Sequence, residues 1–77
     1  QGPPFDLIFI DPPFTEKMAD LVMTAISEST VWKPDTIFAI ESARQEKMED
    51  DYGSLHRFDF REYGDKILSF FKDRSSL

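Results

Sequence analysis

An acidic residue, two prolines and an aromatic ring follow one another at residues 11–14, directly after an apolar run that begins at Phe5. Asp11 and the carbonyl oxygen of Pro12 offer hydrogen-bond acceptors at a turn that cannot continue as a helix, because proline fixes φ and lacks a backbone donor. Phe14 adds a flat apolar face. Acceptors beside a stacking ring suit the exocyclic amino group of a nucleobase drawn out of its stack.

The elements that carry this turn form a predicted strand, helix and strand. Residues 5–10 and 36–41 are apolar at odd and even positions alike, which is typical of strands covered on both faces of a parallel sheet. Between them we expect a helix over residues 16–31, capped by Thr15, with one apolar stripe on the sheet. The stripe consists of Met18, Leu21, Val22, Ala25 and Ile26. This order predicts a right-handed crossover between parallel strands.

The rest of the chain predicts a hairpin. Residues 43–53 are highly charged, and we expect a water-exposed short helix or loop without chemistry. Residues 55–63 alternate apolar and charged side chains, which indicates an edge strand with one wet face. Gly64 permits a tight turn, and residues 67–71 are apolar on both faces, so the last strand lies inside the sheet. The expected order is first, second, fourth, third, with the last strand antiparallel.

Composition limits the size and the class of the protein. The 77 residues are 40% hydrophobic and include eight Phe, enough for the packed core of one domain or of part of one. The chain has no cysteine, which excludes disulfides and thiolate metal sites. No apolar run approaches the ~20 residues of a membrane span, and no signal peptide is apparent, so we expect a soluble cytoplasmic protein.

The charge of the chain is unfavourable for contact with phosphates. Its formal net charge is −6, whereas a nucleic-acid surface calls for clustered lysine and arginine. The chain also begins at Gln1 without an initiator Met and enters a strand almost at once. We therefore expect a piece of a longer protein, with any basic surface on the absent part and the outer side of the first strand left without its neighbour.

With these elements placed, the chain resembles the C-terminal half of the RsmD-like family of small-subunit ribosomal RNA guanine-N2 methyltransferases. The resemblance covers nearly the whole chain and rests on residues 5–14, 40–42 and 61–71. It implies the α/β fold of a partial Rossmann-like class I methyltransferase sheet, with parallel strands and a C-terminal antiparallel hairpin. Residues 1–77 would be the target-base side of that domain, and the cofactor-binding half would be missing.

The resemblance also implies roles for the turn. Asp11 and Pro12 would be catalytic, accepting hydrogen bonds from the target amine, and Pro13 and Phe14 would bind the base. The methyl donor would be S-adenosylmethionine, whose glycine-rich loop and acidic ribose ligand lie earlier in family members and have no counterpart here. We expect an S-adenosylmethionine-dependent N-methyltransferase as the full-length protein, acting on ribosomal RNA or a small-subunit precursor. The fragment alone would be inactive, with no cofactor, metal or membrane bound.

Two other functions stay open. The same turn serves DNA adenine and cytosine amino-methyltransferases and ribosomal RNA adenine enzymes, so the chain could be half of a DNA enzyme. It could also be a non-catalytic interaction module that keeps the fold. In either case an unpaired first strand predicts that the fragment dimerises through its open edge.

Several conspicuous residues are expected to carry no chemistry. His56 is the only histidine and is interpreted as structural or exposed, and Trp32 as a cap on the core. Glu41 ends a buried strand near the predicted site, and we favour a solvated strand end over a supporting role. The acidic run at residues 46–51 lacks the alternating oxygen ligands and central glycine of a calcium loop and is interpreted as hydrophilic surface.

Overall fold

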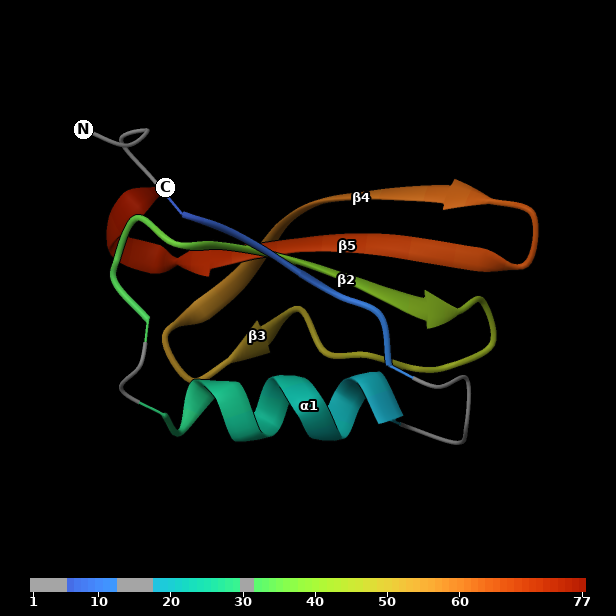
Figure 1. Ribbon diagram of the computed structural model, residues 1–77, viewed down its shortest axis with the longest axis horizontal. Helices are drawn as coiled ribbons and strands as arrows, with labels where there is room; N and C mark the ends of the chain where they lie inside the picture. Colours follow the sequence, from blue (N-terminus) through green and yellow to red (C-terminus); the bar gives the residue numbers. More distant parts are fainter. Residues whose placement is uncertain (1–5, 13–17, 30–31) are drawn as a thin grey trace.

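The structure is a computed structural model that describes residues 6–12, 18–29 and 32–77. In these residues a five-stranded sheet carries one α-helix along one side (Figure 1). The elements in chain order are β1 (Leu7–Ile10), α1 (Met18–Ser27), β2 (Ile37–Ala43), β3 (Asp51–Tyr52), β4 (Leu55–Tyr63), β5 (Lys66–Asp73) and the 3-10 turn η1 (Arg74–Ser76).

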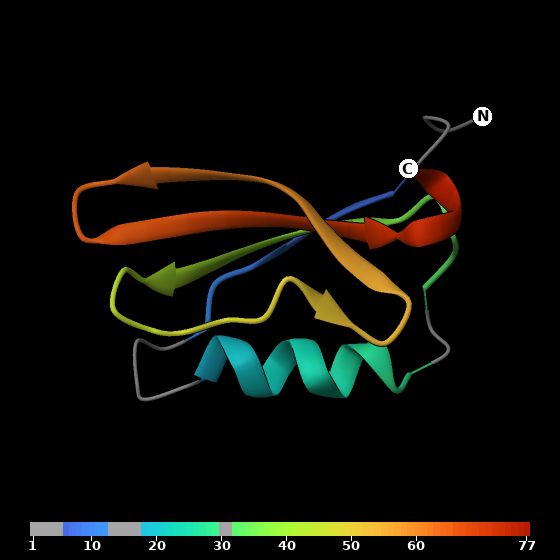
Figure 2. The ribbon, with the colours of Figure 1, turned by 180° about the vertical axis from the view of Figure 1, so that it is seen from behind.

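The strands lie in the order β1-β2-β5-β4-β3. β1 and β2 are parallel, with Ile10 opposite Ile40, and β5 runs antiparallel between β2 and β4. The β4–β5 hairpin turns at Gly64, whose φ is 58°. Seen from behind, β4 and β5 extend together as a long hairpin beyond the helix (Figure 2). The predicted order of the four main strands and the antiparallel direction of the last are confirmed.

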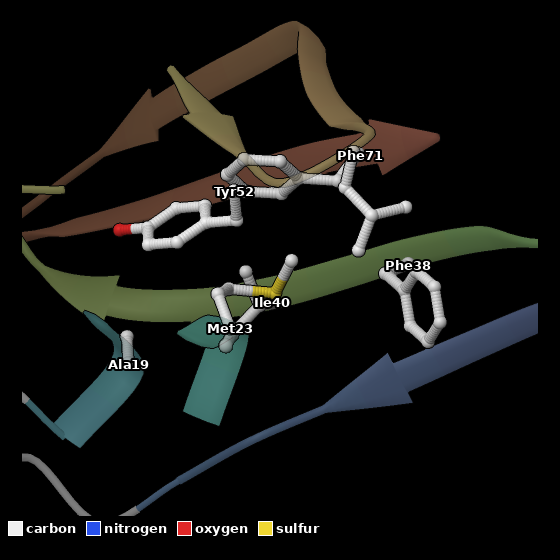
Figure 3. Close-up of a cluster of buried hydrophobic side chains, with 7 residues drawn as sticks. Ala19, Met23, Phe38, Ile40, Tyr52 and Phe71 are labelled. Atoms are coloured by element: carbon white, nitrogen blue, oxygen red, sulfur yellow. The ribbon is translucent and has the colours of Figure 1, made fainter. Parts of the chain in front are cut away.

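The core lies between α1 and one face of the sheet (Figure 3). Met23 of α1, Ile40 of β2 and Phe71 of β5 have no exposed surface. The ring of Tyr52 meets that of Phe71 edge-on, with 5.5 Å between the centroids. Trp32 packs against this core, as predicted for a cap. Apolar residues of five elements, α1, β2, β3, β4 and β5, thus form one small core.

Helix α1 ends earlier than predicted. The sequence predicts a helix over residues 16–31, but α1 ends at Ser27, while residues 15–17 and 30–31 lie outside the described residues. The carbonyl oxygen of Ile26 accepts a bond from the N–H of Ser29 and one from Nε1 of Trp32, both at 2.9 Å. The Ile26 carbonyl oxygen, near the end of the helix, thus finds its hydrogen-bond donors in a turn and in an indole. It needs no donor from a further helical turn.

The buried stripe of α1 is also turned relative to the prediction. Ala19 and Met23 are buried, whereas Leu21 is 59% exposed and Ala25 is exposed. Residues three and four apart share one face of a helix, and Ala19, Met23 and Ile26 form the face that meets the sheet. Leu21 lies about half a turn away from that face. The expected placement of Leu21 and Ala25 was therefore wrong.

The charged segment at residues 43–53 is more than an exposed loop. It ends in β3, which pairs with β4 through Tyr52 and Leu55, both buried. A carboxylate oxygen of Glu46 accepts a hydrogen bond from the N–H of Asp20 in α1 at 2.9 Å. The segment therefore closes one side of the core, and β3 rather than β4 is the outermost strand at that end. Residues 44–50 form a loop, as predicted, whereas Asp51 and Tyr52 form a strand that the sequence did not predict.

A β-bulge changes which side chains of β4 share a face. The register shifts between Arg57, opposite Phe71, and Asp59, opposite Phe70. Phe58 is the extra residue and its ring meets that of Phe70, whereas Phe60 lies opposite Ser69. A bulge moves the residues after it to the other face, so Phe58 and Phe60 do not form the expected single apolar face. They are 39% and 49% exposed.

The face of the sheet opposite α1, here called the open face, carries apolar side chains. It includes Leu7 and Phe9 of β1, which are 62% and 59% exposed. In the part of the chain that the structure describes, no helix lies on this face. The sequence predicts a first strand covered on both faces, and within these residues that cover is lacking. β1 lies at the edge of the sheet. This agrees with the prediction that the outer side of the first strand has no neighbour in this chain.

Candidate functional site

The site predicted from the sequence begins where β1 ends. Ile10 lies opposite Ile40 in the parallel β1–β2 pair, and the next residue of each strand, Asp11 and Glu41, carries a carboxylate. Parallel strands bring their carboxyl ends to one edge of the sheet, where α/β folds place ligands. Asp11 is exposed and Pro12 is buried. The Asp11 carboxyl group is thus accessible at this edge, while the following proline anchors the turn.

Three side chains meet here, and we call them the Asp11 cluster: Asp11, Glu41 and Tyr63. The hydroxyl group of Tyr63, at the end of β4, donates a hydrogen bond to Oε2 of Glu41. Glu41 is in turn hydrogen-bonded to the side chain of Asp11. The interpretation of Glu41 as a simple solvated strand end was therefore wrong, since it connects the other two residues.

The turn that carries Tyr63 is braced by Arg44. The guanidinium group donates to the carbonyl oxygen of Gly64 from Nη2 at 2.9 Å and from Nε at 3.1 Å. It also donates to Oε1 of Glu62 at 3.0 Å. The backbone N–H of Arg44 bonds the carbonyl oxygen of Asp65 at 2.8 Å. These bonds tie the tip of the hairpin to the end of β2, which is where Glu41 lies.

The contacts within the Asp11 cluster shift the pKa values of its three members in different directions. The hydrogen bond to Glu41 raises the pKa of Asp11, and desolvation and the charge of Glu41 act in the same direction. The Tyr63 hydroxyl lowers the pKa of Glu41, and donating that bond raises the pKa of Tyr63. The positive charge of Lys66 lowers both carboxyl pKa values. These effects separate the two carboxyl groups, with the pKa of Asp11 shifted upward and that of Glu41 downward.

This arrangement suits the recognition of an amino group. The hydrogen bond with Glu41 engages one oxygen of the Asp11 carboxyl group, which leaves the other oxygen as an acceptor. Because Asp11 is exposed, that oxygen can meet a ligand without burial of an unpaired charge. A planar ligand bearing N–H donors fits such an acceptor at the end of a strand.

The structure describes only part of the predicted site. Asp11 and Pro12 are placed as given above, whereas Pro13 and Phe14 lie outside the described residues. The two roles assigned to those residues, binding and stacking the base, stay predictions. Sequence reasoning missed Tyr63 as a member of the cluster. Its position in the turn at residues 63–65 is the signal that could have pointed to it, because a hairpin tip beside β2 reaches the same edge.

The described residues do not fit a cofactor loop. Gly53 and Gly64 both have positive φ and occupy the turns of the β3–β4 and β4–β5 hairpins. Neither precedes a helix, as a glycine-rich nucleotide-binding loop does. Within residues 6–12, 18–29 and 32–77 there is also no group of three or more histidine and acidic side chains able to hold a metal ion. Over the same residues, none of the helices has the length and hydropathy to cross a membrane.

His56 plays no part in the cluster. Its Nδ1 lies 2.8 Å from Oδ1 of Asp51, which also accepts a bond from Nη2 of Arg74 at 2.7 Å. These contacts join β3, β4 and the start of η1 at the end of the sheet away from Gly64. The structural interpretation of His56 is in keeping with this position.

Comparisons with known proteins connect this geometry to a family. The family model described as conserved hypothetical protein 95 matches residues 1–72. A conserved hypothetical protein of Streptococcus pyogenes superposes with a TM-score of 0.78 at 16% identity, over 91% of this chain and 44% of that one. A Haemophilus influenzae protein described as a candidate methylase gives 0.76 at 18% identity, over 88% and 42%.

These likenesses confirm the fold predicted for the chain, an α/β sheet with parallel strands and an antiparallel hairpin. The chain spans less than half the length of the two solved structures. Among curated proteins, none matches it.

Proposed function

The chain belongs to the family described as conserved hypothetical protein 95, and on that premise we propose that it is the target-base part of a methyltransferase acting on an exocyclic amino group of RNA. A solved structure of the same fold is described as a candidate methylase. The finer proposal is guanine N2 of small-subunit ribosomal RNA or its precursor, in the cytoplasm, as the sequence resemblance implies. Residues 1–77 would be the part that presents the base.

One observation carries this proposal, namely the exposed carboxyl group of Asp11 at the carboxyl end of β1, held by Glu41. Transfer to an amine requires the lone pair of the nitrogen to face the methyl group. An acceptor that holds an amine N–H fixes that direction and stabilises the positive charge that develops on nitrogen. Asp11 and the carbonyl oxygen of Pro12 would supply such acceptors, and Phe14 would stack on the base, which is worth ~1–3 kcal/mol.

The methyl donor in this proposal is S-adenosylmethionine, which when bound supplies an electrophilic methyl group. The described residues do not form its cradle, and the matched structures are more than twice as long as the chain. We therefore place the donor site in a part of the protein outside residues 1–77. The chain itself would bind and orient the amine.

A second candidate function is a non-catalytic interaction module. The exposure of Leu7 and Phe9 favours it, because an apolar strand at a sheet edge can pair with another chain. The DNA amino-methyltransferase alternative shares the Asp11 chemistry and differs only in the nucleic acid presented. Comparing RNA and DNA substrates in the same assay separates these two enzymes.

The test is a methylation assay of the longer protein that carries this chain. We expect Asp11→Ala to lower kcat by about 100-fold with little change in KM for RNA, because the carboxyl group acts on the reacting nitrogen. Phe14→Ala should chiefly raise KM. The matched control is Asp6→Ala, since Asp6 is also exposed and lies just before β1 at its opposite end. An Asp11→Ala variant as active as Asp6→Ala would refute the assignment.

Calorimetry tests the division of the domain. Titration of S-adenosylmethionine should give clear heat with the longer protein and none with residues 1–77. Tight binding by the 77-residue chain would overturn the proposal that the donor site lies elsewhere. Binding by neither would favour the interaction module.

A further inference from the structure

We propose that Tyr63 and Glu41 are positioning residues for Asp11. The Tyr63 hydroxyl group holds the Glu41 carboxylate, and that carboxylate orients the Asp11 side chain toward the target amine. This inference rests on the proposed function of Asp11. The inference adds two successive contacts to that proposal, one from Tyr63 to Glu41 and one from Glu41 to Asp11. They lead from the end of β4 across the open face to the end of β1.

Asp11 needs such a partner because it is exposed. An aspartate in water turns freely about its side-chain bonds, and acceptor geometry is lost when it does so. The parallel register places Glu41 directly beside it, one residue beyond the Ile10–Ile40 pair. A hydrogen bond between the two carboxyl groups leaves one Asp11 oxygen engaged and the other directed outward.

Glu41 can hold that position because it is itself fixed. Lys66 lies between Tyr63 and Ala43 across the three strands, so all three side chains share the open face with Glu41. The tyrosine ring reaches back along this face to Glu41. The turn that presents it has a positive φ at Gly64 and is clamped by Arg44. The contact between Tyr63 and Glu41 is therefore made from a backbone segment that other hydrogen bonds hold in place.

The charges around the cluster bear on the pKa values of its two carboxyl groups. Four titratable groups meet at this edge, one from each of four strand ends: Asp11, Glu41, Tyr63 and Lys66. Arg61 lies on the open face across Leu68 from Glu41 and pairs with Asp59, while Arg44 pairs with Glu62. Because Tyr63 donates to Glu41, the pKa of Glu41 is lowered, whereas the hydrogen bond with Glu41 raises the pKa of Asp11.

The test is a pH titration of the carboxyl carbons of residues 1–77 by nuclear magnetic resonance. In Tyr63→Phe we expect the titration midpoint of Glu41 to rise, because the ionised form loses its donor. The midpoint of Asp11 should fall, because a protonated Glu41 now donates to it. The matched control is Tyr52→Phe, which removes the other tyrosine hydroxyl from the core and should leave both midpoints unchanged.

A second variant keeps the inference testable without relying on the tyrosine. Glu41→Gln removes the neighbouring charge, so the Asp11 midpoint should fall as well. Amide spectra that match the wild type confirm that each variant is folded. An Asp11 midpoint that stays in place in both Tyr63→Phe and Glu41→Gln overturns the positioning role.

Activity then separates this inference from the proposed function. In the longer protein, Tyr63→Phe should lower kcat about tenfold and leave KM for RNA unchanged, since misplacing a catalytic group by a fraction of an ångström has effects of this order. If Tyr63→Phe shifts the midpoints of Glu41 and Asp11 as expected but Asp11→Ala keeps full activity, the proposed function is wrong. If Asp11→Ala is inactive but the Asp11 midpoint does not respond to Tyr63→Phe or Glu41→Gln, only the positioning role is wrong.

Discussion

The hydroxyl group of Tyr52 donates a hydrogen bond to Oδ1 of Asp20 at 2.5 Å and accepts one from the N–H of Glu49 at 2.9 Å. The first bond joins β3 to α1, and the second closes the loop that leads into β3. Burial and the bond to Asp20 raise the pKa of Tyr52 above its ordinary value of 10.0, so the hydroxyl group is protonated at neutral pH. One polar side chain thus ties the charged segment before β3 to the core.

Replacing Tyr52 tests how much these two hydrogen bonds contribute to stability. We expect Tyr52→Phe to lower the free energy of unfolding by about 1–2 kcal/mol, because a part-buried carboxylate and a backbone N–H both lose a partner. Urea unfolding followed by circular dichroism measures the change. Tyr63→Phe is the matched control, since Tyr63 is 44% exposed, and it should unfold close to the wild type. Equal losses in the two variants would contradict the role of Tyr52.

Asp51 predicts how stability depends on pH. The bond from Arg74, followed by the contact with His56, lowers the pKa of Asp51 below its ordinary value of 3.8. The unfolded chain therefore binds a proton at higher pH than the folded one, so this carboxylate contributes stability above the ordinary value. That contribution is lost as the pH falls through the folded pKa.

The measurement is urea unfolding at a series of pH values. Asp51→Asn should be less stable than the wild type at neutral pH, and the difference should shrink as the solution is acidified. Arg74→Gln removes the largest cause of the shift and should act in the same direction. Curves for the wild type and Asp51→Asn that stay parallel from neutral to acidic pH would exclude this account.

The sheet was predictable because its pattern is local. Residues 67–71 place apolar side chains on both faces, and β5 does lie between two strands. β3 was not predictable, because two residues make no pattern and only their pairing with Leu55 and His56 of β4 defines the strand. The bulge at Phe58 was hidden for a related reason. The alternation of side chains along the sequence is the same with or without an extra residue in the ladder.

The site was predictable in part. Asp11 follows from the apolar strand that ends before it, and its neighbour Glu41 follows from the parallel register of two strands that the sequence predicts. The turn at residues 63–65 indicates the edge at which Tyr63 lies, but its contact with Glu41 depends on the length of the hairpin and on the turn held by Arg44. The end of α1 depends likewise on a distant group, the indole of Trp32. Contacts between elements decide these features.

Gly64 provides a test of the hairpin turn. Its φ of 58° lies in the left-handed region, and a Cβ there would meet no atom within 4 Å. Backbone strain is therefore the only cost of a side chain, and Gly64→Ala should lower the free energy of unfolding by about 1 kcal/mol. Gly64→Asn is the control and should cost less, because asparagine tolerates this conformation better. An alanine variant at least as stable as the wild type would contradict the turn.

The open edge of the sheet predicts self-association of the 77-residue chain. β1 is the outermost strand, and its Leu7 and Phe9 are more than half exposed. An unpaired apolar strand recruits another strand, because pairing satisfies its backbone groups and buries its side chains. Sedimentation should therefore show dimers or larger species as the concentration approaches the millimolar range.

The variant Phe9→Lys distinguishes pairing through β1 from nonspecific hydrophobic association. A charged side chain on the edge strand opposes pairing, so the variant should stay monomeric at concentrations where the wild type associates. The matched control is Leu77→Lys, because Leu77 is 63% exposed but lies after η1 and outside the strands, and it should associate like the wild type. A wild-type chain that is monomeric at millimolar concentration would mean that the edge of β1 is not a pairing surface. In that case the interaction-module alternative would lose the one observation that favours it.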